Sequence, residues 1–141
     1  MKGMSDALFH GRRSIGWLWA LLWVSATAVG CGSENEQEVG PSGAICSTDS
    51  SLSYQSFGRD FMQRYCTRCH GSNLAGSARH GAPSGHDFDT LESIQRTPIE
   101  HIDEQAAAGI FQINTAMPPD APRPTEPERR ELGEWLACGL P

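Results

Sequence analysis

Apolar positions recur at helical spacing in two stretches, one in the middle of the chain and one at its end. Phe57, Phe61 and Tyr65 lie four residues apart, which places three aromatic side chains on one face of a helix. The second stripe consists of Leu132, Trp135, Leu136 and Leu140. Thr125-Glu126-Pro127-Glu128 has capping-box spacing before this stripe, and Gly139 is placed to end the helix. The pattern predicts a helix at each end of a folded domain.

Capping signals also predict shorter helices between these two. Thr97-Pro98-Ile99-Glu100 follows the same rule and predicts a helix that runs to about Ala108. Asp89 or Thr90 is placed to cap a short helix that continues to Gln95. Every predicted element is helical, so the sequence predicts a small all-α domain of three to five helices.

The first 30 residues form an export signal in this interpretation. Arg12 and Arg13 precede a mostly apolar run at residues 15–29, which closes on small residues before Cys31. A run of 15 residues, at about 1.5 Å each, is shorter than the roughly 30 Å hydrocarbon core, so a retained membrane anchor fits less well. The small residues before Cys31 resemble a bacterial lipobox, which implies a lipidated cysteine at the mature N-terminus. Ordinary secretion with cleavage is the other alternative.

The segment after Cys31 is polar and contains glycine and proline, a composition that does not bury enough surface to become ordered. We therefore expect residues 31–45 to form a flexible acidic tether and residues 46–141 to form the folded domain. Only 37 of the 111 residues after residue 30 are apolar, which is a thin supply for a core. The domain must then be cross-linked or gain apolar surface from a cofactor.

Charge excludes one class of partner. Residues 31–141 carry eight arginines, no lysine and sixteen acidic residues, which gives a net charge of −8 with histidine neutral. A chain with this balance repels a phosphate backbone. We therefore expect no nucleic-acid partner.

The chemistry of the domain is indicated by Cys66-Thr67-Arg68-Cys69-His70, a C-x-x-C-H motif typical of c-type haem attachment. Two thiols at this spacing can each add to a haem vinyl group, and the adjacent histidine is then placed as an axial ligand of the iron. A thioredoxin-like redox pair fits less well, because no βαβ pattern surrounds the motif. A zinc site also fits less well, because no second cysteine or histidine pair supplies the remaining ligands at the usual spacing.

Further residues around the motif match a known family. Gly58 and Met62 lie eight and four residues before the first cysteine, and Ala116-Met117-Pro118-Pro119 follows His70 with the methionine 47 residues on. With these features, residues 53–139 resemble the class I cytochrome c family. In that family the first and last helices cross, and a glycine at the place of Gly58 allows their close approach.

The resemblance implies a cytochrome c-like fold wrapped around one covalent haem c. Thioethers to Cys66 and Cys69 would attach the haem, and His70 and Met117 would be the axial ligands of its iron. Pro83 resembles the proline whose backbone carbonyl orients the second ring nitrogen of the axial histidine.

Several other residues are candidates for contacts with this haem. His80, His86 and His101 are rival iron ligands or else surface histidines. Arg79 and Arg123 could pair with the haem propionates or else be solvated. Apolar residues expected to cover the macrocycle are Leu74, Phe88, Leu91, Ile94, Ile110, Phe111 and Trp135.

Assigning Cys31 to lipid and Cys66 and Cys69 to haem leaves Cys46 and Cys138. Outside the cytoplasm such an even remainder favours a disulfide, with two free thiols as the alternative. The bond would connect the start of the domain to the end of its last helix.

The sequence as a whole predicts an exported monohaem c-type cytochrome, lipid-anchored in the bacterial periplasm or on the outer face of a membrane. Its expected role is to carry single electrons between membrane or periplasmic redox proteins, without catalysis of its own. One alternative is a small haem peroxidase or gas-binding sensor with an open sixth iron position, in which His80, His86 or His101 would be the distal residue. Another is a cytochrome subunit fixed to a dehydrogenase.

Overall fold

The computed structural model describes residues 40–141, so the expected signal peptide and the lipidation site Cys31 lie outside the described part. Within residues 40–141 the chain is helical and contains no β-strand, apart from an isolated bridge between Ala108 and Ile113. The α-helices are α1 (Arg59–Tyr65), α2 (Leu91–Ile94), α3 (Ile99–Ala106) and α4 (Glu126–Ala137). Two further turns are η1 (Tyr54–Gly58), which is π-helical, and η2 (Gly76–Arg79), which is a 3-10 helix. The prediction of a small all-α fold is confirmed.

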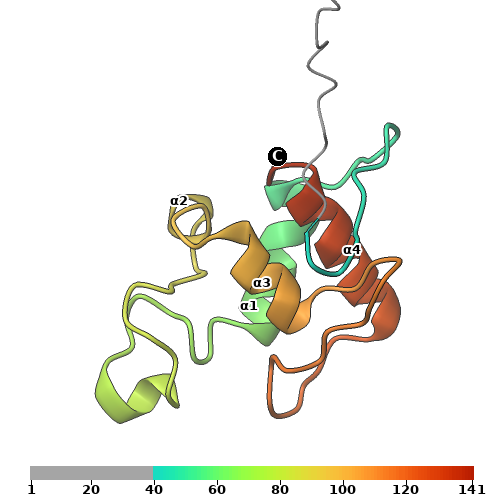
Figure 1. Ribbon diagram of the computed structural model, residues 1–141. Helices are drawn as coiled ribbons and strands as arrows, with labels where there is room; N and C mark the ends of the chain where they lie inside the picture. The colour runs from blue at the N-terminus through green and yellow to red at the C-terminus, as the bar shows by residue number, and fades with distance from the viewer. Residues whose placement is uncertain (1–39) are drawn as a thin grey trace, which may run out of the picture. The chain divides into compact units, whose positions relative to one another are not determined.

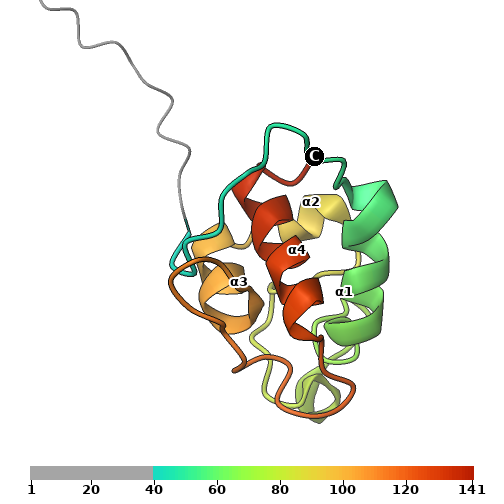
Figure 2. The same cartoon turned by 90° about the vertical axis from the view of Figure 1, so that its right-hand side faces the viewer.

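None of the helices within the described residues is long and apolar enough to cross a membrane. Helix α4 lies between α1 and α3, and α2 lies behind α4 in Figure 2. In Figure 1, α2 and α4 lie on opposite sides of α3.

Helix α1 continues directly from η1, so the chain from Tyr54 to Tyr65 is helical throughout. Ser53 begins this stretch with a capping box, since its hydroxyl accepts from the Ser56 amide. The predicted aromatic face is present: the ring centroids of Phe57 and Phe61 are 5.3 Å apart, and those of Phe61 and Tyr65 are 5.0 Å apart. This face points toward α4, and its Phe61 and Tyr65 are part of the buried core.

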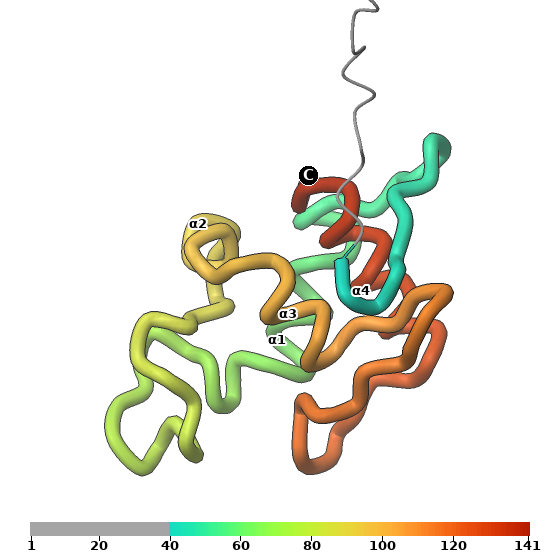
Figure 3. The backbone as a smooth tube through the Cα atoms, in the orientation of Figure 1, coloured from blue at the N-terminus to red at the C-terminus, as the bar shows by residue number. Residues whose placement is uncertain are grey.

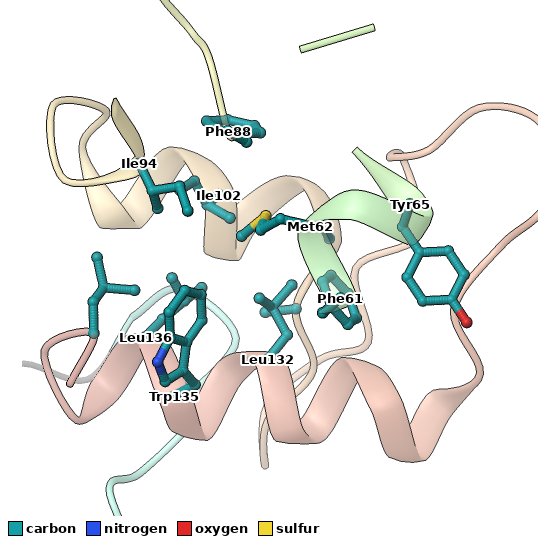
Figure 4. Close-up of a cluster of buried hydrophobic side chains, with 12 residues drawn as sticks. Phe61, Met62, Tyr65, Phe88, Ile94, Ile102, Leu132, Trp135 and Leu136 are labelled. Carbon is teal, nitrogen blue, oxygen red and sulfur yellow. The ribbon is translucent and has the colours of Figure 1, made fainter. Parts of the chain in front are cut away.

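Helix α4 supplies three further core residues, Leu132, Trp135 and Leu136. Its N-terminus carries the predicted capping box of Thr125 and Glu128. Figure 4 shows Leu132, Trp135 and Leu136 pointing from α4 toward α1 and α3. Trp135 is fully buried beside Gly58, where an added Cβ would collide with the indole ring. Gly58 therefore permits the close approach of the first and last helices, as the resemblance implied.

Helix α2 begins as expected, with Thr90 as its cap. Helix α3 does not: it begins at Ile99, with Pro98 in the N-cap position and no side-chain cap. Thr97 lies one residue too early to cap it, and its hydroxyl has no hydrogen-bond partner. The helix also ends at Ala106 rather than near Ala108, because the backbone of Ala107 turns to an extended conformation.

Two long segments, residues 66–90 and 107–125, leave the helices and extend toward the same end of the domain (Figures 2 and 3). The first follows α1 and contains the C-x-x-C-H motif. The second connects α3 to α4 and contains Met117. The fold thus brings together two loops that are well separated in the sequence.

The N-terminal boundary differs from the expectation. Ser42 is fully buried, and its amide and hydroxyl donate hydrogen bonds of 2.6 and 2.7 Å to the two carboxylate oxygens of Asp103 in α3. Ala44 is buried as well, against Gly133 of α4. Residues 40–45 therefore belong to the folded domain rather than to the tether. The local composition predicted otherwise because this contact is made with a residue 61 positions away.

A disulfide between Cys46 and Cys138 connects the beginning of the domain's sequence to its end. Their separation of 92 residues encloses nearly the whole domain in one covalent loop. Closing such a loop lowers the entropy of the unfolded chain more than a short loop would. The bond is thus expected to be a major source of stability.

Replacing both Cys46 and Cys138 by serine should lower the free energy of unfolding by about 4–5 kcal/mol, the entropic value for a loop of this length. Denaturant unfolding of the haem-containing protein measures this, with the reduced wild-type protein as a control that should match the double variant. Equal midpoints for the variant and the oxidised wild type, or alkylation of both thiols in the native protein, would contradict the bond.

Candidate functional site

A cavity of about 340 Å³ lies between the two loops and the helices α1, α3 and α4. Cys66, Cys69 and His70 line it from the first loop, and Met117 lines it from the second. Most of its remaining wall is apolar and includes Phe61, Tyr65, Phe88, Ile102, Leu132 and Pro118. The volume falls within the range of about 300–1,000 Å³ that is usual for ligand sites. The structure therefore gathers all four predicted haem contacts around one apolar space.

The C-terminal end of α1 places the two cysteines and the histidine. Helix α1 ends at Cys66, whose amide makes a last helical hydrogen bond of 2.9 Å to the Met62 carbonyl. The amides of Cys69 and His70 both return to the Cys66 carbonyl, at 3.1 and 2.9 Å. This tight turn presents both thiols and the imidazole to the cavity.

The two thiols are not disulfide-bonded to each other. Burial raises the pKa of the Cys66 thiol to about 12, so this thiol is protonated in the folded chain. Redox-active cysteines of the thioredoxin type instead have lowered pKa values, so this thiol disfavours a thioredoxin-like redox pair. Within residues 40–141, moreover, no group of three or more histidine, cysteine or acidic side chains is arranged to hold a metal ion, which disfavours a zinc site.

His70 is half-buried, and its ring stacks on Phe88 with 4.6 Å between ring centroids. Its Nδ1 lies 2.8 Å from the backbone carbonyl of His86. A carbonyl only accepts, so Nδ1 carries the proton and Nε2 is left as the metal-binding nitrogen. Burial lowers the pKa of His70, the His86 hydrogen bond opposes this, and the charge of Arg79 lowers the pKa further. The ring is therefore held neutral, as an iron ligand must be.

The orienting carbonyl is that of His86, and the expectation for Pro83 is wrong in this respect. The Pro83 carbonyl accepts a hydrogen bond of 2.7 Å from Nη2 of Arg79, although Pro83 itself lines the cavity. Arg79 is buried, and neither it nor Arg123 lines the cavity. The exposed Arg123 instead contacts the Pro119 carbonyl. Neither arginine is therefore positioned to pair with a haem propionate.

Met117 is held by its backbone. Its amide donates to the Gln105 carbonyl at 2.8 Å, and its carbonyl accepts from Nη1 of Arg129 at 2.9 Å. Arg129 is buried in α4 and also donates to the carbonyls of Ala106 and Asn114, at 2.7 and 2.8 Å. The loop around Met117 is thus tied to both α3 and α4. The Met117 side chain itself is 41% exposed.

The three rival histidines, His80, His86 and His101, all line the same cavity. The rings of His86 and His101 approach each other, with 6.4 Å between centroids. The positions of these histidines therefore do not exclude any of them as an iron ligand in place of Met117.

The expected apolar cover of the haem is mostly wrong, since Phe88 is the one residue of that set that lines the cavity. Ile94 and Trp135 lie in the core, and Ile110 and Phe111 are 68% and 75% exposed. The cavity is instead lined by residues of the two loops and, from the helices, by apolar side chains that include Phe61, Tyr65, Ile102, Ala106 and Leu132. The apolar stripes of α1 and α4 were visible in the sequence, but periodicity alone does not distinguish core from cavity wall.

A haem fits the residues that are present. It would meet apolar walls, the thiols of Cys66 and Cys69, a neutral imidazole with an available Nε2, and a thioether. Thr97 also lines the cavity, and its Oγ1 is buried without a partner. An orphaned hydroxyl is costly, so a polar group of the occupant, such as a propionate, would satisfy it. A bound haem would therefore explain why the Thr97 hydroxyl lies at the cavity and does not cap α3.

A helical domain with such a site is of the c-type cytochrome class. The family model described as cytochrome c oxidase, cbb3-type, subunit III matches residues 56–136. The chain therefore belongs to this family of cytochrome c domains, and membership implies covalently bound haem c. Comparisons with curated proteins and with solved structures gave no match.

Replacing Thr97 by valine in the haem-containing protein should lower the free energy of unfolding by about 1 kcal/mol, because the variant loses a hydrogen bond to the occupant. Denaturant unfolding measures the change, with Thr115→Val at an exposed position as the control. If the hydroxyl is instead unpaired in the complete protein, the valine variant will be the more stable one.

Proposed function

We propose that the protein is an exported monohaem cytochrome c that passes single electrons between membrane or periplasmic redox proteins. The observation that carries this proposal is the convergence of Cys66, Cys69, His70 and Met117 on one apolar cavity. Cys66 and Cys69 would hold the haem through thioethers, and Nε2 of His70 and the sulfur of Met117 would bind its iron.

The side chains around the cavity suit electron transfer without bond-making chemistry. Haem iron bound there supplies one electron at a time by changing its oxidation state. With His70 and Met117 both bound to the iron, no position on the metal would remain for a substrate or a gas. The thioether of Met117 favours reduced iron and therefore raises the reduction potential. No general acid or base is required.

The N-terminal contacts bear on where the partners lie. With a lipid on Cys31 and Gly40 packed against Asp103 of α3, nine residues (31–39) would lie between the lipid and the domain. A fully extended chain of that length spans at most about 30 Å. The domain would therefore stay close to the membrane surface. This favours donors and acceptors that are themselves located at that membrane.

The matching family is described as an oxidase subunit, which favours a second candidate function. In it, the domain is a fixed cytochrome subunit of a larger redox complex rather than a mobile carrier. Size-exclusion chromatography after extraction from membranes in mild detergent distinguishes the two functions. A mobile carrier should elute alone, and a fixed subunit should elute in constant ratio with an enzyme.

Replacing Met117 by alanine separates the carrier from an enzyme or sensor. The oxidised wild-type protein should show the weak long-wavelength sulfur-to-iron charge-transfer band, and the variant should lose it while keeping covalent haem. Its reduction potential should fall, and it should gain carbon monoxide binding because an axial position opens. Absorption spectra and carbon monoxide titration measure these changes.

Met62→Leu is the matched control, since Met62 is fully buried in the core and does not line the cavity. It should keep the band. Wild-type protein that lacks the band and binds carbon monoxide would contradict the carrier and favour the peroxidase or sensor. A low-spin spectrum without the band would indicate His80, His86 or His101 as the ligand instead.

A further inference from the structure

The guanidinium of Arg79 is fully engaged inside the first loop. The residue is only 5% exposed, and it forms an ion pair of 2.8 Å with Asp87. Its other hydrogen bonds go to the backbone carbonyls of Gly71, Ala82, Pro83 and His86. An arginine has five N–H donors, and these five bonds use all of them. None is left for a haem propionate.

One of these bonds reaches the candidate axial ligand through a shared atom. The His86 carbonyl oxygen accepts from Nδ1 of His70 at 2.8 Å and also from Nη2 of Arg79 at 3.1 Å. The hydrogen bond on Nδ1 controls how basic the imidazole is toward a metal on Nε2. Arg79 is therefore placed to adjust that bond without touching the metal site.

We propose that Arg79 is a positioning residue that weakens the hydrogen bond from His70 to His86 and thereby raises the reduction potential of the bound haem. This inference rests on the axial role proposed for His70. A carbonyl that also accepts from a cation withdraws the Nδ1 proton less strongly, so His70 is a weaker donor to oxidised iron. One electron is gained on reduction, and the Nδ1 proton stays on His70.

The charge of Arg79 acts in the same direction. A buried positive charge beside the His70 ring disfavours the oxidised, more positive iron. Asp87 offsets part of this charge, because its carboxylate is paired with Nη1 of Arg79. Removing the arginine leaves the carboxylate uncompensated, which again favours oxidised iron. Both effects predict that the potential falls when Arg79 is neutralised.

The test is a redox titration of the haem-containing protein and its Arg79→Gln variant. At a fixed solution potential, the ratio of oxidised to reduced protein should rise by about tenfold in Arg79→Gln, which corresponds to a fall of about 59 mV for one electron. Arg79→Lys keeps the charge but not the planar fork, so its shift should be smaller. Arg130→Gln is the matched control, because Arg130 is exposed on α4 and pairs with Glu126. That variant should leave the ratio unchanged.

A purely structural role for Arg79 would destabilise the loop without moving the potential. If Arg79→Gln keeps covalent haem and titrates like Arg130→Gln, the inference is wrong and the electron-carrier proposal stands. If the wild-type protein shows no reversible one-electron titration, the proposed function itself fails.

If Arg79→Gln does not fold, the Asp87→Asn variant tests the same effect of the Arg79 charge on the reduction potential. Removing the countercharge leaves the guanidinium in place, so the ratio of oxidised to reduced protein should fall. An unchanged or raised ratio would overturn the inference.

Discussion

Two buried arginines hold the loops on which the rest of the site depends. Backbone carbonyls that leave helical structure and become buried need donors, and a guanidinium can supply several at once. Arg79 satisfies four carbonyls of the first loop, and Arg129 satisfies three carbonyls around the second. Through these bonds the backbones beside His70 and Met117 are fixed on the cavity. Without them, neither loop contains enough regular structure to keep a ligand in place.

The two ends of the domain are stabilised in different ways. At one end Trp135 packs beside Gly58, the Cys46 to Cys138 bond closes the chain, and Ser42 is held by Asp103. At the other end lies an apolar cavity with an unpaired Thr97 hydroxyl in its wall. Exposed apolar surface and an orphaned donor are both unfavourable in water. A bound haem would supply the missing part of the core, which also explains the low apolar content of residues 31–141.

Features that depend on local sequence were predictable. The aromatic face of α1, the Thr125 cap of α4 and the C-x-x-C-H motif all follow from spacing within a few residues. Features set by tertiary contacts were not. The pairing of Ser42 with Asp103 joins residues 61 apart, and the carbonyl that orients His70 comes from His86, 16 residues away, rather than from Pro83. The prediction that Thr97 caps α3 was wrong because the Thr97 hydroxyl lies at the cavity rather than at the start of the helix.

The central claim is that Cys66 and Cys69 bond a haem that completes this core. The direct measurement uses protein expressed in a host with c-type maturation. The protein is denatured and extracted with acidified organic solvent, which removes haem that is not covalently bound. It is then digested, and peptide mass spectrometry locates the haem. The account predicts that the haem stays on the peptide containing Cys66, Cys69 and His70. Haem that leaves the polypeptide during extraction, or that remains attached when both cysteines are replaced by serine, would contradict it.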